Sequence, residues 1–223
     1  MSYLFGHPGE VAFLLVQPFE LCAAALAIAF AIALPLGFLA ARNKRASATL
    51  LGILGALYTL PSLALFALLI PLLGLGFLTA LVALVAYAQV ILVRNIAAGL
   101  RGVPAALREA ARGLGMTPWQ SFWRVELPQA LPVIVGGVRI ATVSLVALAN
   151  LAAWIDAGGL GVLLFAGLRN DDPGKIVTGS LASALLAIGA DGALRALERR
   201  LARHASLTEG TRGERARIAP HGP

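Results

Sequence analysis

Five long apolar stretches are the feature that most constrains this chain. A helix needs roughly 20 mainly apolar residues to cross the hydrocarbon core of a bilayer, and each of these stretches meets that length. Charged residues make up only 13% of the chain, whereas about a quarter of the residues are charged in a soluble domain. We therefore predict an all-α membrane protein with about five transmembrane helices, over residues 19–41, 49–73, 78–100, 131–153 and 176–197.

Basic residues fall mainly on one side of these predicted spans. The segments 42–45 and 101–130 hold three and four Lys or Arg residues, and seven more lie from Arg195 onward. The segments on the opposite side hold only Arg169 and Lys175. Because cytoplasmic loops carry an excess of Lys and Arg, we predict a multi-pass protein with its N-terminus outside and its C-terminus in the cytoplasm. Topology then explains the net charge of +7, and no nucleic-acid partner is expected.

The two ends of the chain lie outside the predicted membrane domain, which covers residues 19–200. Residues 1–18 are mildly apolar and contain no Lys or Arg. We expect them to form a retained segment at the membrane surface, broken by Pro18, and not a signal peptide. Residues 201–223 are polar and basic, and we expect a disordered cytoplasmic tail.

Prolines and glycines mark irregular points inside the membrane domain. Pro61 and Pro71 interrupt the second span, which predicts that this span is bent or partly broken. Gly74 and Gly76 predict a turn directly after it. The Gly-rich, mixed-charge stretch 154–175 predicts a loop before the last span.

The sequence holds few residues that could carry chemistry of their own. Cys22 is the only cysteine, which excludes a disulfide within the chain. The three histidines lie near the ends and lack metal-ligand spacing. There is no G-x-x-x-x-G-K-[ST] run, so we do not expect the chain to hydrolyse ATP. The spans contain no cluster of His, Asp, Glu or Ser, and we predict a protein that is not an enzyme and holds no metal or cofactor.

The polar segment 101–130 carries strong local signals for a first short helix. Pro104 suits the first turn of a helix, and the residues that follow are mostly helix formers. Gly115 is placed to end this helix in a left-handed cap. Val103, Leu107 and Leu114 share one face at helical spacing.

A second short helix is predicted directly after the first. Thr117 and Gln120 have the spacing of a capping box, and Pro118 between them suits the first helical position. Aromatic residues form an apolar stripe after it, and Pro128 is expected to end the helix with the preceding residue extended. Two short helices at a bend make either a docking element for a partner or a hairpin that lies on the membrane surface without one. The aromatic stripe consists of Trp119, Phe122 and Trp123.

The same segment resembles the EAA signature of ABC-importer permeases. Glu109, Ala110 and Ala111 are followed after three residues by Gly115, then after nine residues by Val125, one residue, and the pair Leu127 and Pro128. In that family this loop forms coupling helices that dock on the ATPase subunit, where ATP is bound. The resemblance therefore implies an ATPase contact at Glu109, Ala110, Ala111, Gly115, Leu127 and Pro128.

Further stretches resemble the glycine betaine/carnitine/choline permeases, the osmoprotectant group. They are residues 59–76, 93–116 and 157–161. The resemblance implies a type I ABC-importer transmembrane domain in a bacterial inner membrane. It also implies ATPase subunits, an extracytoplasmic substrate-binding protein and a second permease copy as partners. Ile91, where we expect proline, and Asp156, where we expect glycine, depart from the pattern and leave the cargo open.

Other functions remain to be weighed against an osmoprotectant importer. A permease for an amino acid or another small zwitterion would keep the same architecture and partners. An ATP-independent channel or secondary transporter would leave the EAA pattern unexplained, and the sequence contains no internal repeat of the kind found in many secondary transporters.

Polar residues within the spans are the remaining candidates for function. Arg139 and Asp191 each lie a turn or two from the cytoplasmic end of a span, and they could pair with one another. Tyr87, Gln89 and Asn150 could line a translocation path or form hydrogen bonds between helices. For Asp156 we favour pairing with a loop arginine over contact with a cationic substrate.

Overall fold

The computed structural model describes residues 8–217, and over this range all regular secondary structure is helical. Among the described residues, four helices are long and apolar enough to cross a membrane, and α3 with α4 makes a fifth span when this bent pair is counted as one. This matches the prediction of about five transmembrane helices. The elements are α2 (Pro8–Arg42), α3 (Lys44–Tyr58), α4 (Ser62–Leu73), α5 (Phe77–Arg101), α6 (Ala105–Gly113), α7 (Pro118–Ser121), the π-helical turn η1 (Phe122–Glu126), α8 (Leu127–Ala152), the short 3-10 turn η2 (Ala153–Ile155), α9 (Gly161–Arg169) and α10 (Pro173–Arg217).

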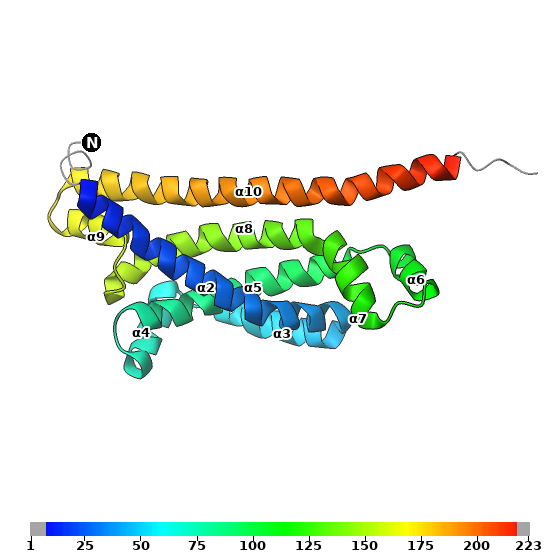
Figure 1. The fold of residues 1–223 in the computed structure, drawn as a ribbon. Coiled ribbons are helices and arrows are strands. Elements are labelled where there is room, and N and C mark those ends of the chain that lie inside the picture. The colour runs from blue at the N-terminus through cyan, green and yellow to red at the C-terminus, as the bar shows by residue number, and fades with distance from the viewer. Residues whose placement is uncertain (1–7, 218–223) are drawn as a thin grey trace, which may run out of the picture.

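The central helix is α5, which packs between α2 and α8 (Figure 1). Small residues allow the close approach of these helices, as expected where lipid provides no hydrophobic driving force between them. A methyl group on Gly37 of α2 would lie 2.5 Å from the Ile96 side chain, and one on Gly137 of α8 would lie 2.4 Å from Asn95. Substitution of either glycine would force α5 away from its neighbour.

The second predicted span is broken, as Pro61 led us to expect. Helices α3 and α4 meet at 92°, with residues 59–61 between them. Pro61 precedes the first residue of α4, whereas Pro71 lies inside α4 without ending it. Gly74 and Gly76 after α4 have φ of 79° and 106°, so the predicted turn is confirmed.

Other boundaries differ from the sequence-based expectations. Helix α2 passes through Pro18 without a break, because helices in lipid tolerate proline when other groups satisfy the freed backbone. The stretch 154–175 contains the additional helix α9, which we had assigned to a loop. Helix α10 continues to Arg217, and its Ala, Leu, Arg and Glu residues favour helix where we expected disorder. Residues 1–7 and 218–223 lie outside the described range.

The basic segments gather at one end of the helical bundle. Helices α6 and α7 lie at this end, while α4 and α9 lie at the other (Figure 1). The Arg101 guanidinium donates to the carbonyl of Ala40 at 2.6 Å and to Ser47 Oγ at 2.5 Å, which ties the ends of α2, α3 and α5 together. This arrangement places the segments 42–45 and 101–130 on one side, as the charge asymmetry requires.

Candidate functional site

Helix α6 ends in a complete Schellman cap built around Gly115. Gly115 has a φ of 72°, a left-handed conformation that favours glycine. Its N–H donates to the carbonyl of Arg112 at 2.9 Å, and the N–H of Met116 donates to the carbonyl of Ala111 at 3.1 Å. The predicted left-handed cap is therefore confirmed, and it fixes the direction in which the chain leaves α6. At the other end of α6, Pro104 occupies the N-cap position, one residue before the first turn in which we expected it, and makes no side-chain capping hydrogen bond.

Helix α7 begins with the predicted capping box. The Gln120 N–H donates to Thr117 Oγ1 at 3.3 Å, and the Thr117 N–H donates to Gln120 Oε1 at 3.0 Å. Pro118 takes the first helical position, where its missing N–H costs no hydrogen bond. The two caps together hold α6 and α7 at a defined bend.

The second helix does not end at Pro128, which corrects the sequence-based prediction. Leu127 is helical, with φ −63° and ψ −46°, and its N–H donates to the carbonyl of Phe122. The turn η1 is a π-helical turn, in which each bond spans one more residue than in an α-helix. This shift in register lets the proline enter the first turn of α8, so α7, η1 and α8 form one continuous helical path.

Large apolar side chains are exposed on this loop. The exposed fractions are 73% for Leu114, 69% for Trp119 and 45% for Trp123, and we call these three residues the loop surface. Phe122, from the same stripe, is buried and packs edge-on against Phe38 of α2, with 5.0 Å between ring centroids. Aromatic residues on an exposed, structured element are typical of a protein interface.

The residues of the EAA pattern divide between this surface and its support. Glu109, Ala110 and Gly115 are exposed beside the loop surface, and Pro128 is exposed at the start of α8. Ala111 is 3% exposed and faces inward, and Leu127 is partly buried. The structure therefore leaves Glu109, Ala110 and Gly115 accessible to a partner, while Ala111 and Leu127 support the loop from within.

A buried ion pair anchors the loop to the first span. Arg42 Nη2 at the end of α2 lies 2.8 Å and 2.7 Å from the two carboxylate oxygens of Glu126 in η1. The Glu126 side chain is 4% exposed and that of Arg42 is 40% exposed. Arg42 also lies over the ring of Phe38 at 5.2 Å. Sequence reasoning missed this pair, because 84 residues separate its members and Glu126 occupies an unspecified position of the EAA pattern.

The polar residues proposed for a translocation path are engaged in hydrogen bonds between elements. Gln89 Nε2 donates to the carbonyl of Ala29 in α2 at 3.2 Å. Asn150 Oδ1 in α8 accepts from Ser183 Oγ in α10 at 3.0 Å. Among the three candidates, Tyr87 alone lines one of the hollows described below.

A charged cluster joins α8 to α10 near the loop end of the bundle. Arg139 Nε lies 2.9 Å from Asp191 Oδ1, which confirms the predicted pair. The cluster also contains Glu198, 2.5 Å from Arg139 Nη1, and Arg195, 2.9 Å from Asp191 Oδ2. Mutual pairing lets these charges occupy a helix interface close to the membrane.

Asp156 does not make the predicted pair with a loop arginine within residues 8–217. It is exposed and ends η2 in a left-handed conformation, with φ 66°. A short side chain that can bond locally tolerates this conformation better than most residues, which explains an aspartate where we expected glycine.

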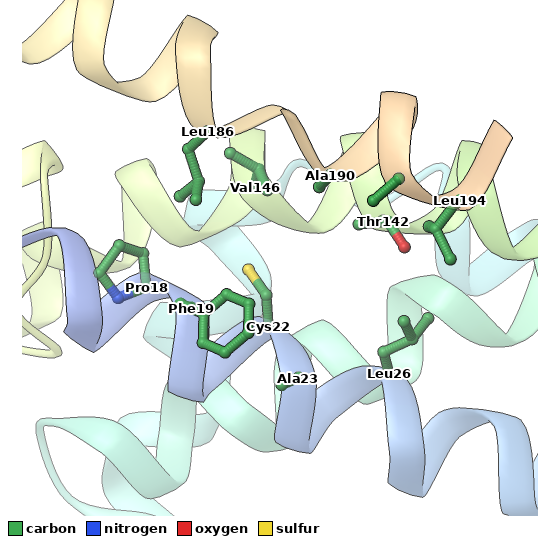
Figure 2. Close-up of a pocket in the computed structure, with 11 residues that line it drawn as sticks. Pro18, Phe19, Cys22, Ala23, Leu26, Thr142, Val146, Leu186, Ala190 and Leu194 are labelled. Carbon is green, nitrogen blue, oxygen red and sulfur yellow. The ribbon is translucent and has the colours of Figure 1, made fainter. Parts of the chain in front are cut away.

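Two hollows in the bundle have different linings. The first, between α2, α8 and α10, is lined by apolar side chains such as Phe19, Cys22 and Leu194 (Figure 2). The Thr142 hydroxyl, its one polar side-chain group, already donates to the carbonyl of Val138 at 2.8 Å. This hollow offers little to a polar solute.

The second hollow, of about 360 Å³, lies at the break between α3 and α4, and we call it the break hollow. Its lining combines aromatic rings, hydroxyl groups and apolar side chains, without any charged group. It therefore has the mixed character of a site for a small organic solute. The lining residues are Tyr58, Leu60, Ser62, Tyr87, Ser144, Ala147 and Leu148.

Comparison with known proteins supports a membrane transport role. Residues 33–203 match the family model described as "Binding-protein-dependent transport system inner membrane component". The chain is 42% identical over 203 residues to the osmoprotectant import permease protein OsmW of Salmonella typhimurium, covering 89% of this chain and 94% of that protein. It is 39% identical over 201 residues to the choline transport system permease protein OpuBB of Bacillus subtilis, covering 90% and 93%.

Solved structures share the fold. The chain is similar to the permease chain in inward facing structures of the MetNI methionine ABC transporter, with a TM-score of 0.78 and 24% identity. The match covers 86% of this chain and 98% of that one. The helical arrangement described above is therefore that of an ABC-importer transmembrane subunit.

Proposed function

Because the chain belongs to the family of inner membrane components of binding-protein-dependent transport systems, we propose that it forms the translocation path of an ATP-driven importer for an osmoprotectant. The cargo class is a small quaternary ammonium solute such as glycine betaine, choline, carnitine or proline betaine. Relatives named for osmoprotectant and choline transport, aligned over nearly the whole chain, support this cargo.

The observation that carries the coupling role is the rigid loop with an exposed apolar surface. Its two caps fix α6 and α7, and the side chains of Leu114, Trp119 and Trp123 are exposed on these capped helices. We assign this surface, with Glu109, Ala110 and Gly115, to contact with an ATPase subunit that binds and hydrolyses ATP. A hairpin lying on the membrane surface would also expose apolar groups, but it would not need the EAA spacing.

The remaining partners follow from the same role. An extracytoplasmic binding protein delivers the cargo, and a second permease copy, identical or related, completes the path at a shared interface. We assign the ATP site and the hydrolysis of ATP to the ATPase subunit, since the sequence has no G-x-x-x-x-G-K-[ST] run. The charge asymmetry orients the loop toward the cytoplasm, where the ATPase is available.

The test measures ATP hydrolysis by the complete importer in liposomes, with the binding protein and each of betaine, choline, carnitine, proline and methionine. We expect one or more of the quaternary ammonium solutes to stimulate hydrolysis. Gly115→Asp should abolish this stimulation, because it adds a charge at the ATPase contact. Gly115→Asn, of the same size and tolerant of the left-handed backbone, should retain most of it.

The outcomes separate the alternatives. Stimulation by proline or methionine alone would favour an amino-acid importer with the same architecture. Uptake that continues in the absence of the ATPase subunit would instead establish a channel or a secondary transporter, and would refute the importer proposal.

A further inference from the structure

The break between α3 and α4 lies at membrane depth and leaves its residues exposed. Residues 59–61 are all exposed in the isolated chain. Helix α3 has 15 residues and so rises about 22 Å from the basic segment 42–45, which places the break within a hydrocarbon core about 30 Å thick. The N–H groups of Thr59 and Leu60 donate to carbonyls of α3, and the Pro61 carbonyl accepts from the N–H of Leu65. The break is therefore a hydrogen-bonded turn whose residues are open to their surroundings.

Two tyrosines from neighbouring helices meet at this break. Tyr58 ends α3 and Tyr87 lies in α5, with their ring centroids 5.6 Å apart and their planes at 75°. The Tyr87 hydroxyl donates to the carbonyl of Leu60, which ties the break to the central helix. Tyr87 is 5% exposed, whereas Tyr58 is 46% exposed. Tyr58 therefore presents an open aromatic ring to the break hollow, held in place by its contact with Tyr87.

The rest of the lining suits a cation that binds weakly and is then released. The hydroxyls of Ser62 and Ser144 and the apolar side chains of Ala147 and Leu148 complete the break hollow. The face of an aromatic ring attracts a cation through its quadrupole. An acidic side chain would hold a permanent cation more tightly, whereas transport requires binding that is weak enough for release. The carbonyl end of the α3 dipole, next to Tyr58, adds a modest attraction for positive charge.

We propose that the break hollow is a transient binding site on the translocation path for the trimethylammonium head of a quaternary ammonium solute. The ring of Tyr58 is the cation-binding face, the apolar side chains contact the methyl groups, and Tyr87 is a positioning residue. This inference rests on the proposed function and adds to it a site within the permease, separate from the binding protein.

The experiment uses the complete importer in liposomes and measures uptake of the quaternary ammonium solute that the wild type transports. Tyr58→Phe keeps the ring, while Tyr58→Leu removes it from a position exposed enough to tolerate the change. A second series places phenylalanines of increasing ring fluorination at position 58, which weakens the cation–π attraction with little change in size. Leu63→Ala, at an exposed position of α4 outside the hollow, is the matched control.

We expect Tyr58→Phe and Leu63→Ala to transport like the wild type, and Tyr58→Leu to raise the KM for uptake on the order of tenfold. Uptake should fall stepwise with fluorination, because each fluorine weakens the attraction of the ring face for a cation. Uptake that is indifferent to fluorination, or a Tyr58→Leu variant within twofold of the wild type, would overturn the site. Absence of quaternary ammonium uptake by the wild type would refute the proposed function itself, so the two failures are distinct.

Discussion

The loop between α5 and α8 and the break between α3 and α4 both interrupt helices with proline, but they are built in different ways. In the loop, side-chain and backbone caps satisfy the helix ends, and the helical path resumes through a π-helical turn. At the break, the chain turns by 92° and residues 59–61 are exposed. The loop presents large apolar side chains from two capped helices, while the break presents one exposed aromatic ring beside a sharp turn.

This difference separates two kinds of partner. The loop of α6 and α7 is held by its own hydrogen bonds, so it can pass a movement of a bound protein on to the spans without changing its shape. An exposed break beside a neutral hollow can contact a solute and release it. The loop follows directly after the end of α5, whereas the break contacts α5 near its middle, at Tyr87.

The largest loss of stability is expected when the loop loses its ion pair with α2. Arg42→Ala leaves the Glu126 carboxylate, 4% exposed, without its ionic partner and with only the Ser121 hydroxyl, at 3.5 Å, as a donor. Removal of one member of a buried pair costs roughly 3–5 kcal/mol, and we expect about 3 kcal/mol because water reaches Arg42. Glu126→Gln should cost less, since it leaves the more exposed charge behind. Thermal unfolding of the purified complex measures both variants, and equal losses would show that burial of Glu126 does not set the energy.

A smaller effect, confined to binding, is expected at the loop surface. Trp119→Ala should weaken binding of the ATPase subunit by about 2 kcal/mol, or about 30-fold, as for an aromatic hot spot. Its effect on stability should stay within about 0.5 kcal/mol, because the side chain is 69% exposed. Trp154→Ala is the control, since Trp154 is 66% exposed at the opposite end of the bundle. Equal loss of ATPase binding in both variants would remove the distinction between the ends.

At the break, loss of one hydrogen bond should have a moderate effect on stability. Tyr87→Phe removes the donor to the Leu60 carbonyl and keeps the ring contact with Tyr58. We expect a loss of about 1 kcal/mol in unfolding free energy. Tyr58→Phe should be neutral in the same measurement, since the Tyr58 hydroxyl has no hydrogen-bond partner in the described part of the chain. A neutral Tyr87→Phe would indicate that the bond does not hold the break to α5.

The sequence predicts the loop better than the break for a physical reason. The caps at Gly115 and Thr117 depend on residues within one or two turns, so their spacing can be read directly. The Arg139–Asp191 pair was predicted because two opposite charges at similar depth in a membrane have few other partners. The Tyr58–Tyr87 contact depends on how α3 folds back at the break, and nothing local to either tyrosine specifies that.

The errors have equally specific causes. Pro128 was read as a helix stop because the rule for proline assumes an α-helical register, and a π-helical turn changes that register. Helix α9 is short and lies between glycines and charged residues, which outweighed its apolar centre in our reading of a loop. Gln89 and Asn150 are not among these errors, because their place on the path stays a prediction. The sequence could not name their partners, Ala29 and Ser183, which belong to neighbouring helices.

The smallest loss of stability is expected when α7 loses the N-cap of Thr117. Thr117→Ala removes the acceptor for the Gln120 N–H, and a lost N-cap typically costs about 1 kcal/mol. We expect somewhat less here, because α7 is continuous with η1 and α8 and the rest of that path remains bonded. Thr117→Ser keeps the hydroxyl and is the control. Hydrogen exchange at the Gln120 amide should accelerate about fivefold in Thr117→Ala and remain unchanged in Thr117→Ser, whereas acceleration along the whole of α8 would mean that the cap supports the span and not only the loop.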